Sequence, residues 1–449
     1  MNIYSDTKIY IVAPGNYHTG GVELLHQLCS EMISMGLDAY MVYYPTVSFN
    51  EEDPIDDFYR KYHLPYVANI DDNSHNILIV NETATQYLYA VKTTRRVLWW
   101  LSVDNYLTTL SIQMDFYSQT NLTAKKLRRF FYFTDQDDDI EHWVQSEYAR
   151  QFIALNIGEE KKVKFVGDYL NQEFLEEHPQ NAPTKKQDVI VYNPQKGFEF
   201  TRKLMAAASE LKWIPIENMT PAEVRQCLSS AKVYIDFGSH PGKDRIPREA
   251  AMSGCVVITG RKGAAANNID IKISNEFKFD EKTAPLTKIV AKIKSVMLDY
   301  ENEYAKQEDY RNSIRQERDR FRCEVADALE LPQPKEIIAL IADPEECAGM
   351  IDSLKKHRKT MKPCYIVNDK IATLTGVCKR KNIIQEYNVN HVIFPDGNKL
   401  AAITTKDAAF LYKEGRIRFF AFSFSKKELV NAVRNSINCH ITDCIVVGR

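Results

Sequence analysis

The chain has 449 residues, which at roughly 150 residues per domain predicts about three domains. Hydrophobic residues make up 44% and charged residues 26%, which excludes a wholly disordered, collagen-like or coiled-coil chain. Lys and Arg number 58 against 60 Asp and Glu, so the overall charge does not indicate a nucleic-acid partner. Residues 335–449 hold 19 Lys and Arg against 12 Asp and Glu, so a module of charge +7 follows a body of charge −9. Such a module fits an anionic surface or an acidic neighbouring domain equally well.

The opening residues lack the charged start and apolar run of a signal peptide, and no run of about 18 apolar residues indicates a transmembrane helix. Nine irregularly spaced cysteines then predict reduced thiols in a cytoplasmic protein. The densest cluster, Cys439, His440 and Cys444, lacks the paired spacing of a zinc site. We therefore expect no metal ion.

Strands separated by helix-length segments predict an α/β fold with a parallel sheet over residues 1–178. A β-rich run at 8–13 leads into a helix whose apolar residues recur from Val22 to Met35, and Gly36 supplies the left-handed cap. A polar stretch with two prolines at 176–187 predicts a linker. The further strands of this first lobe are expected at 38–44, 77–80, 97–101, 143–145 and 163–166.

A second α/β lobe is expected over 188–330, and a third, smaller α/β module over 335–449. The second lobe alternates strands at 188–193, 212–217, 233–237 and 255–259 with helices at 197–211, 220–231 and 247–254, and a long helical tract follows at 284–329. In the third module we expect strands at 337–342, 364–367, 391–394 and 444–447, an edge strand at 416–424, and helices at 344–357 and 426–436.

Three loops carry residues suited to a phosphate-bearing ligand. Gly20 and Gly21 precede the first helix, where backbone amides and the helix dipole favour negative charge, although any tight turn can also need glycine. The second lobe adds Lys196 after its first strand, and Lys243, Arg245 and Arg248 around a helix start. Because ligands of open α/β sheets bind at the carboxyl ends of strands, Lys196, the 239–249 loop and the 260–264 turn should share one edge.

These motifs resemble GT-B glycosyltransferases, and most of all the retaining nucleotide-sugar transferases of family 4, also called group 1. The resemblance rests on Gly20-Gly-Val-Glu23, on Lys196-Gly197 after a strand, and on Glu249-Ala-Ala-Met-Ser-Gly254 in a helix. It covers roughly residues 8–325 and implies two Rossmann-like lobes, to which the third module would be appended. The His240-Pro-Gly-Lys-Asp-Arg245 loop resembles a divergent branch associated with bacterial surface-polysaccharide synthesis. The resemblance to family 4 implies that Lys196 binds the diphosphate of the sugar donor and Glu249 its ribose; the carboxylate of Glu249 could instead offset the helix dipole.

The chain is thus expected to be an enzyme that moves a sugar from a nucleotide diphosphate to a glycan or lipid-linked glycan, with no cofactor. The sequence does not indicate an oligomeric state. The rival function is that of a non-catalytic nucleotide-sugar-binding or scaffold protein, because the family's second acidic residue, eight positions before Glu249, is replaced by Pro241. The residues expected to bind the sugar donor are Gly20, Gly21, Asn193, Lys196, His240, Lys243, Arg245, Glu249 and Gly263.

The catalytic candidates are Asp104, His18, Lys196 and Arg245. Asp104 follows a strand that contains Trp99 and Trp100, and its carboxylate could take the proton of an acceptor hydroxyl, which requires hydrogen-bond contact. His18 lies in the glycine-rich loop. Lys196 and Arg245 would stabilise charge on the leaving diphosphate.

Two neighbouring segments have more than one interpretation. Residues 125–133 combine four cations with four aromatic side chains, as in a segment that binds the cytoplasmic face of an anionic membrane, or in a charged helix face that leads into a buried strand. Residues 135–139 have the acidic spacing of a metal-binding loop, but an exposed acidic loop is the simpler interpretation.

Overall fold

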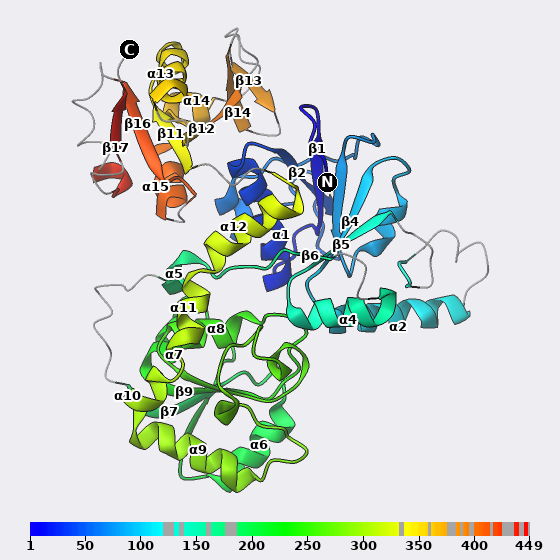
Figure 1. The fold of residues 1–449 in the computed structure, drawn as a ribbon, viewed down its shortest axis with the longest axis vertical. Coiled ribbons are helices and arrows are strands. Elements are labelled where there is room, and N and C mark those ends of the chain that lie inside the picture. Colours follow the sequence, from blue (N-terminus) through cyan, green and yellow to red (C-terminus); the bar gives the residue numbers. More distant parts are fainter. Residues whose placement is uncertain are drawn as a thin grey trace. The chain divides into compact units, whose positions relative to one another are not determined.

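The protein is described by a computed structural model (Figure 1), and it forms three sheets in chain order. Two compact units comprise Met1–Val80, Ala90–Arg96 and Val325–Arg449, and Asn81–Tyr89 with Val97–Glu324. The described residues are 1–119, 130–133, 139–158, 163–175, 186–331, 336–357, 361–374, 383–386, 389–394, 399–413, 416–423, 435–439 and 444–447.

The first sheet has six strands in the order β2-β1-β3-β4-β5-β6. β1 pairs in parallel with both β2 and β3, as strands joined by crossover segments do. Thr19 begins α1 by accepting a hydrogen bond from the Val22 amide, and Gly36, at φ 80°, follows its end. The strands are β1 (Lys8–Pro14), β2 (Asp38–Tyr44), β3 (Ile77–Asn81), β4 (Arg95–Trp100), β5 (Ile140–Val144) and β6 (Lys164–Phe165). The helices are α1 (Gly20–Ser34), α2 (Val103–Gln119), α4 (Glu147–Ile157) and α5 (Gln172–Leu175), with short 3₁₀ turns η1 (Asp57–Tyr62) and η2 (Thr85–Tyr89).

The second sheet is parallel throughout, in the order β10-β9-β7-β8. Figure 1 shows α6 and α9 on one side of it and α7 and α8 on the other. Its strands are β7 (Gln187–Tyr192), β8 (Lys212–Pro215), β9 (Ala231–Asp236) and β10 (Val256–Thr259). Its helices are α6 (Phe198–Ala207), α7 (Pro221–Ser230), α8 (Arg245–Met252), α9 (Leu286–Leu298), α10 (Tyr300–Ala305), α11 (Glu308–Arg315) and α12 (Glu317–Ala328), with 3₁₀ turns η3 (Gly263–Ala266) and η4 (Asn275–Phe277).

The third sheet is mixed, in the order β13-β14-β15-β12-β11-β16-β17. Among its described strands, the pairs β13–β14 and β14–β15 are antiparallel and the other pairs are parallel. Its strands are β11 (Glu336–Ile341), β12 (Met361–Val367), β13 (Ile383–Glu386), β14 (Val389–Ile393), β15 (Lys399–Ile403), β16 (Phe419–Ser423) and β17 (Cys444–Val447). Its helices are α13 (Pro344–His357), α14 (Asp369–Ala372) and α15 (Thr405–Lys413).

The predicted fold class, α/β with two Rossmann-like sheets and an appended α/β module, is confirmed. The predicted edge strand at 416–424 is wrong, because β16 lies between β11 and β17 with Phe420 and Phe422 fully buried. The predicted tract at 284–329 is divided into α9, α10, α11 and α12. One straight helix of that length would extend about 70 Å, whereas Ile289 and Ile314 both pack into the one core of the second lobe. The predicted helix at 426–436 lies almost entirely outside the described residues.

The glycine at the start of α6 is required by its surroundings. Gly197 has φ 63°, and a Cβ there would lie 2.4 Å from the carbonyl carbon of Phe237. Both the left-handed backbone and the close approach of β9 therefore exclude a side chain. Gly21, at the start of α1, has no atom within 4 Å of such a Cβ and no positive φ.

We predict that Gly197→Ala lowers the free energy of unfolding by about 2 kcal/mol or more, from backbone strain and steric overlap. The matched variant Gly21→Ala should change it by less than about 1 kcal/mol. Calorimetric melting of both variants measures the difference. Equal melting temperatures would show that the backbone at Gly197 and Phe237 can accommodate a side chain at little cost in stability.

Candidate functional site

Three loops of the second lobe meet at the carboxyl edge of its sheet. Gly197, after β7, lies against the backbone of Phe237 and Gly238, after β9. The turn after β10 joins them, because the Ala264 amide donates a hydrogen bond to the His240 carbonyl at 2.8 Å, and a Cβ on Gly263 would overlap that same carbonyl. The predicted convergence of these loops on one sheet edge is confirmed.

Asn193 shapes the first of these loops rather than projecting from it. Its Oδ1 accepts a hydrogen bond from the Gln195 amide at 3.0 Å, and its carbonyl accepts one from the Lys196 amide at 3.4 Å. This Asx turn carries the chain from β7 to Lys196. A contact between Asn193 and a sugar donor stays a prediction.

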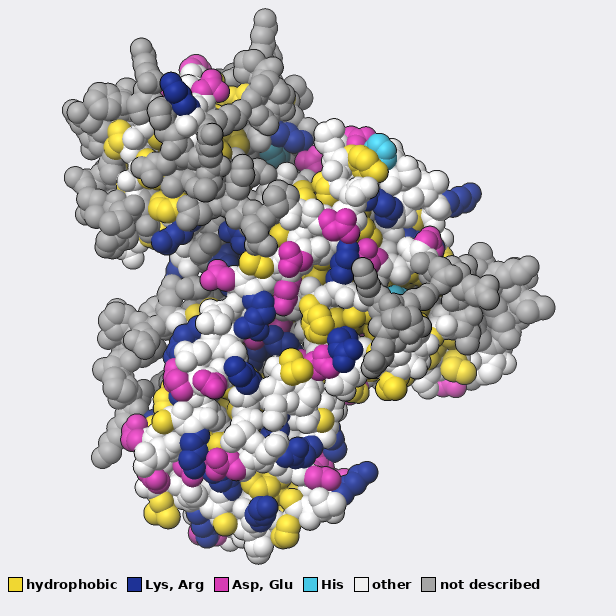
Figure 2. Space-filling view, viewed as in Figure 1, with side chains coloured by type: hydrophobic (Ala, Val, Ile, Leu, Met, Phe, Trp, Pro, Cys, Tyr) yellow, Lys and Arg dark blue, Asp and Glu magenta, His cyan; other side chains and the backbone are white. Residues whose placement is uncertain are grey.

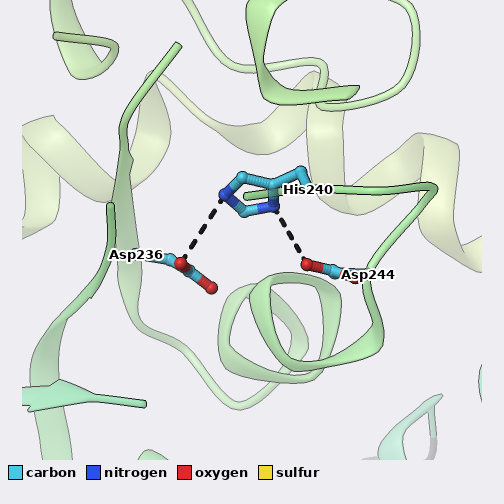
Figure 3. A group of neighbouring side chains, drawn as sticks. All are labelled: Asp236, His240 and Asp244. Carbon is cyan, nitrogen blue, oxygen red and sulfur yellow. Dashed lines mark ion pairs between the residues drawn. The ribbon is translucent and has the colours of Figure 1, made fainter. Parts of the chain in front are cut away.

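Figure 3 shows the imidazole of His240 between the carboxylates of Asp236 and Asp244. Nδ1 lies 3.2 Å from Asp244 Oδ2, and Nε2 lies 3.6 Å from Asp236 Oδ1. His240 is fully buried, and burial alone would lower its pKa; the two carboxylates outweigh that effect and raise the pKa. The two carboxylates therefore favour the protonated form of this buried imidazole, an arrangement that sequence patterns alone did not indicate.

Lys196 completes this cluster. Its Nζ lies 2.8 Å from Asp244 Oδ2, so two cations, His240 and Lys196, face two carboxylates, Asp236 and Asp244. The four charges sum to zero when His240 is protonated. Burial of Asp244 would raise its pKa, but His240 and Lys196 lower it overall, so Asp244 stays ionised.

The Asp236, His240 and Asp244 side chains are also of the types that bind divalent metals, and one atom of each lies within 4.8 Å of the others. Their orientation does not suit a shared ion. The two carboxylates face opposite ring nitrogens (Figure 3), and one metal ion can bind only one nitrogen of an imidazole. The geometry favours a buried imidazolium over a metal centre at this place.

α8 begins two residues earlier than the sequence indicated, at Arg245, and Asp244 is its N-cap residue. The Asp244 side chain makes no capping hydrogen bond, since it faces Lys196 and His240 instead. Glu249 consequently lies beyond the first turn, which weakens the interpretation that it merely offsets the helix dipole. Arg245 and Glu249 are both half-buried at this start of the helix.

Lys243 and Arg248 have strong partners within the protein. Arg248 is 1% exposed and pairs with Glu317 at 2.7 Å and with Asp168 through its other terminal nitrogen. Lys243 Nζ lies 3.0 Å from Glu317 and 3.6 Å from Asp168. Lys243 thus neutralises buried carboxylates, and its predicted contact with a diphosphate stays a prediction.

Asp104 lies beside the 241–243 loop. The amide of Val103 donates a hydrogen bond to the Pro241 carbonyl at 3.0 Å, and Gly242 packs so closely on Leu101 that a Cβ would lie 2.3 Å from the Leu101 oxygen. Asp104 Oδ1 accepts a hydrogen bond from the Tyr148 hydroxyl at 3.1 Å and is partly exposed. The position that lacks the expected acidic residue is therefore next to another carboxylate.

Trp99 and Trp100 are fully buried, so both side chains belong to the core. The carboxylate missed by the sequence analysis is Glu82, directly after β3. It is 1% exposed, and its Oε2 accepts a hydrogen bond from the Leu101 amide at 2.9 Å. Burial raises its pKa to about 7. Its position after a buried strand is the same signal that selected Asp104.

His18, Gly20 and Gly21 belong to the other compact unit. His18 is exposed, and its ring stacks on Phe58 at 4.2 Å between centroids. Gly21 is exposed at the first turn of α1. Glu23, in contrast, is buried and accepts a hydrogen bond from the Tyr62 hydroxyl at 2.8 Å, so it fixes η1. The predicted roles of His18, Gly20 and Gly21 toward a ligand stay predictions.

Residues 125–129 and 135–138 lie outside the described part of the chain, so neither the basic segment nor the acidic run is placed. Phe130 and Phe131, which follow the basic residues, are buried. Within the described residues, no helix has both the length and the apolar composition to cross a membrane.

No protein-family model matches the sequence, and no curated protein matches it. Among solved structures, Anabaena HepE in complex with UDP and glucose is similar at 12% identity and a TM-score of 0.46, over 72% of this chain and 99% of that one. Sucrose-phosphate synthase from Thermosynechococcus elongatus is 11% identical with a TM-score of 0.44, over 72% and 100%. T4 phage BGT in complex with UDP and Mn²⁺ is 12% identical with a TM-score of 0.42, over 74% and 100%. At these scores the likeness assigns no role to any residue of this chain.

Glu82 should make stability depend on pH. Its pKa rises from 4.5 to about 7 on folding, so its contribution is fully present below pH 4.5 and is lost as the pH rises toward 7. The wild type should lose about 3 kcal/mol of its free energy of unfolding across that interval, and we expect Glu82→Gln to abolish this loss. Denaturant unfolding of Glu82→Gln, of the exposed control Glu199→Gln and of the wild type, from pH 4.5 to 8, measures this. Parallel stability curves for all three proteins would contradict it.

Proposed function

We propose that the protein is a glycosyltransferase that moves a sugar from a nucleotide-diphosphate donor to a glycan or lipid-linked glycan acceptor. The observation that carries this proposal is the edge of the second sheet, where Lys196 and Arg245 lie at the start of α8 and Asp104 adjoins the same loop. This arrangement offers cations and a helix N-terminus to a diphosphate, with a carboxylate nearby for the acceptor.

The diphosphate is the part of the sugar donor that these residues suit best. Because the Asp244 side chain makes no capping bond, the first amides of α8 retain their dipole toward an anion. Lys196 would exchange its partner Asp244 for a phosphate oxygen, and Arg245 would share the charge of the leaving diphosphate. Glu249 would accept hydrogen bonds from the ribose hydroxyls.

Proton removal is assigned to Asp104. Its carboxylate is partly exposed and held by the neutral Tyr148 hydroxyl, whose pKa is raised to about 12, first by burial and then by the Asp104 charge. Tyr148 therefore stays protonated and orients one carboxylate oxygen. The other oxygen can accept a hydrogen bond from a hydroxyl of the acceptor substrate.

The transfer reaction is tested by separating binding from turnover. Lys196→Ala should weaken nucleotide-sugar affinity at least about tenfold, the effect of losing about 1.4 kcal/mol of charge attraction. Asp104→Asn should keep the affinity and lower kcat by about 10²-fold or more. Calorimetric titration and release of nucleoside diphosphate measure the two quantities, with Lys203→Ala on the exposed side of α6 as control.

The outcomes distinguish this enzyme from its rival. Wild-type affinity and turnover in Lys196→Ala would overturn the assignment of the site. Tight binding of nucleotide sugars by the wild type, with no transfer or hydrolysis across a panel of glycan acceptors, would favour the non-catalytic binding protein. That rival has one specific observation in its favour, because Pro241 supplies a backbone carbonyl where the family has a carboxylate.

We further propose that the enzyme works at the cytoplasmic face of a membrane, in surface-polysaccharide synthesis. The support is three exposed apolar side chains on α2, since Leu107, Ile112 and Met114 are 46%, 61% and 58% exposed. The sequence places four cations shortly after this helix, within residues 125–129. Cations beside an exposed apolar face suit an anionic bilayer surface.

Ile112→Glu should weaken binding to vesicles of phosphatidylcholine and phosphatidylglycerol about tenfold, because it removes buried apolar area and adds repulsion. Leu298→Glu is the matched control, since Leu298 is 88% exposed at the end of α9 in the second lobe. Vesicle sedimentation measures both variants. Equal binding by both variants would remove the membrane proposal while leaving the transfer reaction untouched.

A further inference from the structure

A separate cavity of about 170 Å³ lies in the compact unit that holds the N-terminus and the third module. One wall comes from the end of α1, the start of β2 and the residues after η1, including Tyr40, Tyr62 and His63. The opposite wall comes from the third module, including Tyr365 and Asn390. A cavity of this size holds a single six-membered ring, since one of about 150 Å³ holds benzene.

Two ion pairs join the walls of the cavity. His63 Nε2 lies 2.8 Å from Asp407 Oδ1, and Lys399 Nζ lies 3.8 Å from Asp38 Oδ1. Each pair joins a residue of the N-terminal segment to one of the third module. A charged ligand that bound one of these four side chains would have to compete with its present partner, whereas an uncharged ligand would not.

The polar groups of the wall are suited to hydroxyls. Tyr365 lies beside the Arg416 guanidinium, and burial raises the pKa of its hydroxyl, so it remains a neutral hydrogen-bonding group. Thr404 and His391 lie on the same wall. Each wall also contains aliphatic residues, such as Leu64 on the N-terminal wall and Ala401 on the wall from the third module. A pyranose ring has this same division, with apolar C–H faces and a rim of hydroxyls.

We propose that this cavity binds one uncharged sugar residue, as a second carbohydrate site distinct from the transfer site. It gives the third module a function, because the ligand would contact both the N-terminal segment and the module. A glycan held there would keep a growing chain at the enzyme between transfers. The site needs no nucleotide, so it does not depend on the proposed reaction.

Saturation-transfer NMR of the full-length protein, with a panel of uncharged monosaccharides and without nucleotide, tests the site. At least one sugar should bind, and His63→Asn should lower the affinity for that sugar at least about tenfold. Asn suits position 63, where φ is 48°, but is too short to replace the contact with Asp407. Lys399→Ala, on the other wall of the cavity, should also lower the affinity for this sugar.

The control is His75→Asn, because His75 forms an exposed pair with Asp6 at 3.0 Å in the same unit and does not line the cavity. Lys196→Ala should bind the sugar like the wild type, which separates this site from the transfer site. Three results would overturn the proposal. They are no binding of any sugar at millimolar concentration, wild-type sugar affinity in both His63→Asn and Lys399→Ala, or binding of a nucleoside in place of a sugar.

Discussion

The buried ion pairs of Arg248 hold the candidate site in place. Its guanidinium is fully buried, and Asp168 and Glu317 raise its pKa further, so it carries its charge at every physiological pH. A buried cation without its partners costs about 3–5 kcal/mol, so these three side chains must stay together. They join the chain after β6 to the starts of α8 and α12. Lys243 adds a second cation to the same carboxylates, and the loop between Lys243 and Arg248 is thereby fixed at both ends.

The Asp244 side chain, between Lys243 and Arg248 in the chain, pairs with cations other than these two. Asp244 faces Lys196 and His240 and leaves the start of α8 without a side-chain cap. The structural ions are thus deeply buried, while Lys196 and Arg245 keep part of their surface accessible. On the face of this lobe that Figure 2 shows, basic side chains are interspersed with acidic ones and form no extended basic surface. The accessible positive charge of the candidate site therefore lies in its own loops.

The sequence predicted what depends on strand order, and missed what depends on distant partners. Lys196 and Gly263 could be placed on one edge because parallel strands end together, and local glycine and charge patterns showed where the turns are. The pairs that hold the loop could not be found this way, since Arg248 and Asp168 are 80 positions apart and Arg248 and Glu317 are 69 apart. Glu82 was within reach, because it follows a strand just as Asp104 does. The burial that raises its pKa depends on packing that no local pattern encodes.

Pro241 helps to fix the position of its loop through its backbone. Its carbonyl accepts the Val103 amide, so the loop of the second lobe is bonded to the residue directly before Asp104. An acidic side chain at position 241 would stand beside Asp104 and Asp244 and would add a third negative charge where Lys196 and His240 balance the existing ones. With proline at this position, Asp244 remains the partner of Lys196, and the Asp104 carboxylate accepts a hydrogen bond from the Tyr148 hydroxyl. Proline at position 241 therefore leaves the charge balance between Asp244, Lys196 and His240 undisturbed.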